Sequence, residues 1–456
     1  MRNAVLVVLC LAGFVGRPVI AQDSIPVEQG VRIGITYAPG VRPGMLVLGG
    51  GGGGDRTTAL DSARTIITRD LHYGDLFEMI VLPMGDSLSL TIGRSPGEDG
   101  DTAASHVPFV NYALYRVLGA DYAVDVSVDR DSSVVVTLHD VAGELTKREV
   151  RIPNLNPNER DFRMRVHRAA DELVRVITGV SGIAASQILF INAGRIYRVD
   201  FDGHTVEALS PEGQNAMSPV WAPDGHRAVY MEFQEGLGPL FMLDLDTGER
   251  RVLPFTQESL NFAPAFSPDG ATLAFSRAGD DGTDIYAYNL ADDCCLQRLT
   301  VGGFSDNLSP TFSPDGQRIA HVSNRPGTPQ IYVMASDGTG QELFAPFDYG
   351  VSGSSHAPEW SADGLSLTFD RDVGRVPQIF VMEVAGRKVR QLTSLGRNYD
   401  PTWAPDGRHL AFVSTRTGSQ QVWIIDMETG AVRQLTRLGE ARLPAWSPRI
   451  PERLNQ

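Results

Sequence analysis

A short motif of the form Pro-x-aromatic-small-Pro-Asp-Gly recurs along the second half of the chain at intervals of 43–48 residues. The copies begin at Pro219, Pro264, Pro310, Pro358, Pro401 and Pro444; the fourth lacks the second proline and the sixth lacks Asp-Gly. A fixed period in the forties is typical of stacked β blades. It predicts the architecture of more than half of the 456 residues.

Each copy has the chemistry of a turn between two strands. Proline presets φ, aspartate can accept a hydrogen bond from backbone two residues on, and glycine takes the position with positive φ. Three further apolar segments separate one copy from the next inner strand; after the first copy they are Ala228–Phe233, Leu240–Leu245 and Arg251–Leu253. Four short antiparallel strands per repeat predict the blade of a β-propeller.

The two ends of the repeat region complement each other. Before the first copy lie three strand-like segments, Ile188–Ile191, Arg195–Val199 and Val206–Leu209, and after the fifth repeat lies a lone strand, Leu443–Ser447. Together they supply one blade, which removes the exposed sheet edges that an open ring would leave. With five complete repeats, this predicts an all-β six-bladed β-propeller over residues 183–456, closed by its C-terminal strand.

Residues 22–182 lack the repeat and predict a small α/β domain. Expected strands are Arg32–Tyr37, Leu76–Leu82 and a meander from Tyr122 to Ile152; expected helices are Leu60–Leu71, Pro108–Leu118 and the amphipathic Phe162–Ile177. Six consecutive glycines, Gly49–Gly54, could form a phosphate-binding loop. The run has no Gly-Lys-Ser/Thr and no dinucleotide fingerprint held in a convincing βαβ unit, so we interpret it as a flexible insertion.

Residues 1–21 have the pattern of a secretory signal peptide. Arg2 precedes the apolar run Ala4–Val15, and Val19–Ala21 forms a small-residue cleavage site before Gln22. A membrane anchor is the alternative, but the apolar run is short and Arg17 and Pro18 follow it. We therefore expect export as a soluble secreted or periplasmic protein.

Charge and cysteine content narrow the function classes. The formal net charge of −15 becomes about −17 without Arg2 and Arg17, which argues against a nucleic-acid partner. Cys294 and Cys295 are adjacent and are the only cysteines beyond the signal peptide. They form either a vicinal disulfide or two inert thiols, and we favour the thiols.

This organisation resembles the TolB family, whose members are periplasmic components of the Tol–Pal envelope system of Gram-negative bacteria. The resemblance is carried by Met217–Gly225, Ala263–Gly270 and Leu443–Pro448 near the chain end. It implies a periplasmic adaptor without catalytic activity that supports outer-membrane integrity and cell division. It also implies two partners: the peptidoglycan-associated lipoprotein Pal on the propeller face, and TolA at the extreme N-terminus. We expect a monomer.

The family's Pal contacts lie in the loops that enter the inner strands. In this chain the resemblance assigns them to Asn261, Ala263, Asp306, Asn307 and Leu308. The corresponding loops of the other repeats extend the predicted partner site to Asn215, Met217, Leu260, Phe262, Ser355, His356, Tyr399 and Asp400. Leu260 and Leu308 stand where the family usually has more polar residues.

Other functions are weighed against the adaptor. Peptidases that share the repeat need a separate α/β-hydrolase domain, so we predict that the chain is not an enzyme. We interpret the repeated aspartates as turn residues and the repeated aromatic residues as core rather than a carbohydrate platform. A carbohydrate-binding or peptidase-associated propeller is the alternative. We expect no cofactor, apart from a structural calcium ion that carboxylates such as Asp306 and Asp400 could hold.

Overall fold

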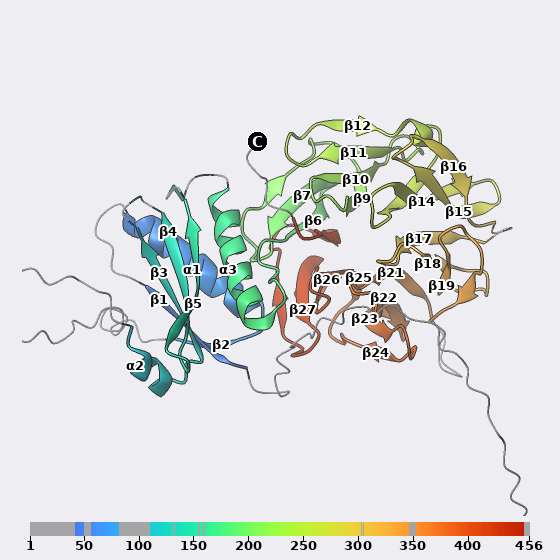
Figure 1. Ribbon diagram of the computed structural model, residues 1–456. Coiled ribbons are helices and arrows are strands. Elements are labelled where there is room, and N and C mark those ends of the chain that lie inside the picture. Colours follow the sequence, from blue (N-terminus) through green and yellow to red (C-terminus); the bar gives the residue numbers. More distant parts are fainter. Residues whose placement is uncertain are drawn as a thin grey trace, which may run out of the picture. The chain divides into compact units, whose positions relative to one another are not determined.

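The computed structural model describes residues 42–49, 56–81, 110–129, 131, 133–153, 156–157, 159, 161–301, 303, 305–345 and 353–450 (Figure 1). All of them belong to one compact unit, Tyr37–Gln456. The predicted signal peptide, the predicted strand Arg32–Tyr37 and Gly50–Gly54 lie outside the described residues. No helix in the described ranges is long and apolar enough to cross a membrane.

The N-terminal part is a five-stranded mixed sheet with the strand order β2-β1-β3-β4-β5. Its strands are β1 (Gly44–Gly49), β2 (Glu78–Ile80), β3 (Tyr122–Val128), β4 (Val134–Asp140) and β5 (Leu145–Ile152). Strands β3 to β5 form the expected antiparallel meander, whereas β1 pairs in parallel with both β2 and β3.

Helices cover both faces of this sheet. Met45 of β1 packs with α1 (Arg56–Tyr73) and α3 (Phe162–Thr178), while its neighbour Leu46 packs with Tyr115 of α2 (Tyr112–Val117). Successive strand residues point to opposite faces, so one strand contributes to both cores. The three helices correspond to those predicted from the sequence.

Strand β1 is the element that the sequence analysis missed. Its sequence, Gly-Met-Leu-Val-Leu-Gly, is short and flanked by glycine, and its pairing depends on strands distant in the sequence. Gly49, the first residue of the glycine run, ends β1; α1 follows from Arg56, and β2 pairs in parallel with β1. Strand β1, helix α1 and strand β2 therefore form a β–α–β unit that was not recognised from the sequence.

Residues 187–446 form the predicted six-bladed propeller, in which each blade is a four-stranded antiparallel sheet (Figure 1). Blade 1 is β9 (Ala216–Trp221), β10 (Arg227–Glu232), β11 (Leu240–Asp244) and β12 (Arg250–Val252); blade 2 is β13 (Asn261–Phe266), β14 (Thr272–Gly279), β15 (Gly282–Asn289) and β16 (Cys294–Arg298); blade 3 is β17 (Asn307–Phe312), β18 (Arg318–Ser323), β19 (Gln330–Ala335) and β20 (Glu342–Leu343). Blade 4 is β21 (Ser355–Trp360), β22 (Ser366–Val373), β23 (Val376–Glu383) and β24 (Val389–Gln391); blade 5 is β25 (Asn398–Trp403), β26 (His409–Ser414), β27 (Gln421–Asp426) and β28 (Val432–Gln434); blade 6 is β29 (Arg442–Trp446), β6 (Gln187–Asn192), β7 (Arg195–Asp200) and β8 (Glu207–Ala208). A 3₁₀ turn, η1 (Pro254–Thr256), links blades 1 and 2.

The ring closes as predicted, because the C-terminal strand β29 pairs antiparallel with β6. Arg442 lies opposite Ile191 and Trp446 lies opposite Ile188. At the end of this ladder the Ser447 N–H donates to the Gln187 carbonyl (2.8 Å) and the Ser447 Oγ accepts from the Gln187 N–H (3.0 Å). The inner strand of blade 6 thus comes from the opposite end of the propeller sequence.

The repeated motif has the predicted roles. In the first copy, Asp224 Oδ1 accepts a hydrogen bond from the His226 N–H (2.9 Å) and Gly225 has φ of 72°. Trp221 is buried and its indole N–H donates to the Ala445 carbonyl of blade 6 (3.0 Å), so the aromatic residue joins neighbouring blades. The tryptophans of the motif are buried, and Phe266 and Phe312 are half-buried.

Cys294 and Cys295 form a vicinal disulfide at the start of β16. The preference for two free thiols in the sequence analysis is therefore wrong. Sequence offered no means to decide, because the bond depends on a local backbone in which Cys295 has φ of 66°.

Candidate partner-binding face of the propeller

Each inner strand has a bulge near its start, immediately before the first proline of the motif. The residue before that proline has positive φ, between 47° and 52°, in all six blades: Ser218, Ala263, Ser309, Ala357, Asp400 and Leu443. Each inner strand also shifts register against its neighbour at this point. Proline has no N–H to donate to a ladder, and a bulge re-aims the side chains around it.

The bulge brings one side chain per blade to the end of the propeller where the inner strands begin. These residues precede the bulge residue, are all half-buried, and define what we term the loop face: Met217, Phe262, Leu308, His356, Tyr399 and Arg442. Four of the six are apolar or aromatic. The partner site predicted from the sequence includes five of them; Arg442 was identified only as part of the sixth loop, Glu440–Arg442, and not as a site residue.

The residues one position earlier point into the propeller. Asn261, Asn307 and Ser355 have no exposed surface, as have Ala216, Asn398 and Ala441 at the same position. The amide of Asn261 donates to the carbonyls of Gly238 (3.0 Å) and Thr256 (2.8 Å). The structure therefore places three of the predicted partner-binding side chains inside the propeller, where the two asparagines hold neighbouring segments together.

The remaining predicted residues divide into two groups. Asn215 is exposed beside the loop face, and Leu260 and Ala263 are half-buried next to Phe262. Asp306 is held within the fold, because its carboxylate accepts from the Thr283 N–H (3.1 Å) and the Asn324 amide (3.0 Å). The structure thus brings the apolar members of the prediction together and uses several polar members internally.

Three carboxyl groups lie behind the loop face: Asp370 is buried, and Asp400 and Glu359 are half-buried. The pKa of Asp370 is raised to about 8, chiefly by burial and also by the nearby carboxylates of Asp400 and Asp372. Burial likewise raises the pKa of Asp400 to about 6 and that of Glu359 to about 7. The Asp400 N–H donates to Asp370 Oδ1 (3.3 Å), so the two acids adjoin. Asp370 could not be singled out from the sequence, because the strand Ser366–Val373 also contains Arg371 and Asp372 and its sequence does not show that Asp370 is buried.

Two groups of His and Asp side chains among the described residues are close enough to hold a metal ion: Asp70, His167 and Asp202, and Asp75, His409 and Asp426. Neither includes Asp306 or Asp400, and the structural calcium ion stays a prediction. In the first group Asp202 already accepts from Arg163 (2.5 Å) and Arg69 (3.2 Å). In the second, Asp426 already accepts from Arg408. We interpret both groups as ion networks that join the α/β part to the propeller.

A segment relevant to the peptidase alternative was missed in the sequence analysis. Gly93-Arg94-Ser95-Pro96-Gly97 matches the Gly-x-Ser-x-Gly pattern of a nucleophile elbow and lies outside the described residues. In that elbow the residue after the serine donates its backbone N–H to the oxyanion. Pro96 has no N–H, so this segment lacks one donor that the chemistry requires.

The described fold defines a class of protein: a small α/β domain joined to a six-bladed β-propeller with one inner strand supplied by the chain end. A family model described as "TolB beta propeller domain" matches residues 174–346 and 349–452. The match covers more than half of the chain, and the chain belongs to this family.

Individual relatives agree with this assignment. The chain is 31% identical over 268 residues to "Tol-Pal system protein TolB" of Anaeromyxobacter dehalogenans, covering 57% of each chain. It is 27% identical over 248 residues to "Protein TolB homolog" of Chlorobium luteolum, covering 53% of this chain and 55% of that one. The aligned regions thus span little more than half the length of these relatives. The crystal structure of TolB from Acinetobacter baumannii has the same fold, with a TM-score of 0.72 and 20% identity over 91% of this chain and 98% of that chain.

Proposed function

We propose that this protein is a periplasmic protein–protein adaptor of a Tol–Pal type envelope system, not an enzyme. Its loop face binds a peptidoglycan-associated lipoprotein, and its N-terminal region binds a TolA-like inner-membrane protein. Through these contacts it supports outer-membrane integrity and cell division. Membership of the TolB propeller family and the names of the relatives support the proposal.

The observation that carries the proposal is the composition of the loop face. Met217, Phe262, Leu308 and Tyr399 are half-buried, and Asn215 and Glu440 are exposed around them. Apolar and aromatic anchors inside a polar rim are the usual anatomy of a protein-binding surface. A catalytic pocket would instead need convergent reactive groups, and of the acids behind this face Asp370 is buried and Asp400 and Glu359 are half-buried.

The test is calorimetric titration of the mature protein with the soluble domain of the peptidoglycan-associated lipoprotein from the same organism. We expect Leu308→Asp and Tyr399→Ala each to weaken binding by roughly 1–4 kcal/mol, about 5-fold to 1,000-fold. The control is Leu365→Asp, an exposed leucine directly after the Ala-Asp-Gly turn of blade 4, which should leave affinity unchanged. Unchanged affinity in both loop-face variants would place the site elsewhere.

Export is tested separately. Mass spectrometry of the protein from the native host should show a mature chain that starts near Gln22, released with the periplasmic fraction. A chain that retains Met1 in the membrane fraction would contradict the proposed location.

A further inference from the structure

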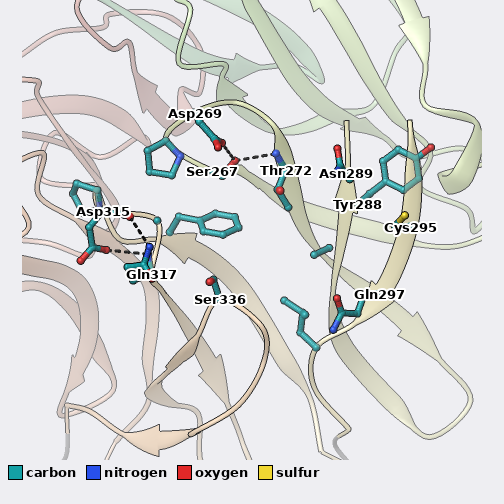
Figure 2. A pocket seen from close by; sticks show the side chains of 16 residues that line it. Ser267, Asp269, Thr272, Tyr288, Asn289, Cys295, Gln297, Asp315, Gln317 and Ser336 are labelled. Carbon is teal, nitrogen blue, oxygen red and sulfur yellow. Dashed lines mark hydrogen bonds between the residues drawn. The ribbon is translucent and has the colours of Figure 1, made fainter. Parts of the chain in front are cut away.

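A cavity of about 470 Å³ lies between blades 2 and 3 (Figure 2), and none of the residues that line it belongs to the loop face. It opens beside the Pro-Asp-Gly turns of both blades, around Asp269 and Asp315. These turns follow the inner strands, so the cavity is at the opposite end of the propeller from the loop face. Its volume falls within the range of small-molecule sites, about 300–1,000 Å³.

One cause of the cavity is the small side chain of Ser336. Its N–H donates to the Gln317 carbonyl of the turn (2.9 Å). The residues that make the same hydrogen bond in the other five blades are all large and apolar: Leu245, Leu290, Val384, Met427 and Phe201. Each of those five side chains packs into a cluster with the preceding blade. Serine therefore leaves unfilled the space that a large side chain closes elsewhere.

On the facing wall of the cavity, Ala287 of blade 2 is likewise smaller than its counterparts in the other complete blades. Ala287 pairs with Ala274, and the residues at the same register in the other complete blades are Met242, Val333, Val381 and Ile424. Each of these four fills the gap to the next blade. The small side chains of Ser336 and Ala287 thus face the same junction between two blades. A dry gap of this size would destabilise the fold unless water or a ligand occupied it.

The polar groups that line the cavity can form hydrogen bonds with the hydroxyl groups of a ligand. Asp269 Oδ1 accepts from Ser267 (2.5 Å) and Ala271 (3.0 Å), and Asp315 Oδ1 makes the equivalent pair of bonds. These hydrogen bonds lower the pKa of both carboxyls, so both are ionised at neutral pH. Within the described part of the chain, no hydrogen bond reaches Oδ2 of either aspartate. The amide of Gln297, on the strand that carries Cys295, lines the same cavity further from the two turns (Figure 2).

The charge of the cavity excludes one class of ligand. Among the described residues that line it there is no Lys, Arg or His, while two are aspartates. Gln297 occupies a register position at which blades 1, 4 and 5 have Arg251, Arg390 and Arg433. A phosphate or carboxylate would therefore be repelled. The half-buried ring of Phe312 and the disulfide at Cys295 supply apolar, polarisable surface within the same cavity.

We propose that this inter-blade cavity is a binding site for a neutral sugar residue. The free carboxylate oxygens of Asp269 and Asp315 accept hydrogen bonds from ring hydroxyls, the Gln297 amide donates to them, and the apolar face of the sugar packs on Phe312. The cavity is distinct from the loop face, so the proposal does not depend on the adaptor function.

The test is titration of the full mature protein with glucose, N-acetylglucosamine and cellobiose, with binding monitored by saturation-transfer NMR. Glucose 6-phosphate is titrated in the same way as the anionic comparison. At least one neutral sugar should bind saturably with Kd of about 1 mM or below, and the phosphate should bind more weakly. Ser336→Leu restores the side chain found in other blades and should weaken binding about 10-fold or more. Gln297→Arg, which installs the residue of three other blades, should do the same and serves if Ser336→Leu fails to fold.

The matched control is Leu365→Gln, which places glutamine at the turn position of Gln317 in blade 4 and should leave sugar binding unchanged. Melting curves verify that each variant is folded. The proposal is overturned if no neutral sugar saturates, if glucose 6-phosphate binds as tightly as the best neutral sugar, or if the folded cavity variants bind as the wild type does.

Discussion

The buried acid Asp370 should make the stability of the propeller depend on pH. Burial raises its pKa from 3.8 to about 8, so the folded protein holds a proton over a pH range in which the unfolded chain has lost it. The stability that this group contributes is therefore complete below about pH 4 and is lost as the pH rises through about 8. Asp370→Asn keeps the shape and an acceptor for the Asp400 N–H but cannot ionise.

The size of the effect follows from the shift. One pKa unit corresponds to about 1.36 kcal/mol, so between pH 6 and pH 9 the wild type should lose roughly 2–3 kcal/mol through Asp370 alone. Glu359, with a pKa of about 7, and Asp400, with a pKa of about 6, add smaller losses in the same direction. The difference in unfolding free energy between Asp370→Asn and the wild type should therefore widen by roughly 2–3 kcal/mol across this interval.

The assay is guanidinium chloride unfolding followed by tryptophan fluorescence at pH 6, 7, 8 and 9. All five tryptophans belong to the propeller, so the signal reports on that part of the protein. The control is Glu383→Gln, an exposed acid at the end of β23, which should give a line parallel to the wild type. If the Asp370→Asn line is also parallel to the wild type, the carboxyl is not held protonated by burial and the reasoning is refuted.

Three further predictions concern the ring, the ion networks and the disulfide. A chain that ends at Arg442 lacks most of β29 and leaves β6 as an open edge. We expect this chain to lose solubility and cooperative melting. If it melted like the full mature chain, closure of the ring by β29 would be contradicted. Asp202→Ala removes the common acceptor of Arg69 and Arg163. Since these arginines are partly exposed, we expect denaturant titration to show a loss of about 2 kcal/mol in the free energy of unfolding. An unchanged free energy of unfolding would argue against the ion network. Replacing Cys294 and Cys295 together by serine should cost only about 1 kcal/mol, because the bond closes a loop of adjacent residues; a loss of several kcal/mol would show that the bond supports more than its own turn.

The blades and their number could be predicted from the sequence because the turn chemistry is local. Pro, Asp and Gly determine the Pro-Asp-Gly hairpin within a few residues, and in the structure Asp224 makes the expected hydrogen bond to the His226 N–H. The partial repeats at the two ends then predicted closure, because an unpaired edge strand is a liability. Strand β1 escaped prediction because its partners β2 and β3 lie about 30 and 75 residues further along the chain.

For the loop face, the sequence identified the loops but not which side chains they expose. Met217, Phe262, Leu308 and Tyr399 follow from aligning the motifs, whereas the burial of Asn261 and Asn307 depends on groups contributed by the preceding blade. The raised pKa of Asp370 likewise depends on the tertiary structure, chiefly through burial and secondly through Asp400 of blade 5.

The inter-blade cavity could not be predicted from the sequence alone. Ser336 and Ala287 are unremarkable as single residues, and only their hydrogen-bonded positions show that larger side chains fill the equivalent places in other blades. Local turn geometry is encoded in consecutive residues and can be predicted from them. Burial, electrostatics and empty space arise between residues that the closed ring brings together from different blades, and these properties were decided only by the tertiary structure.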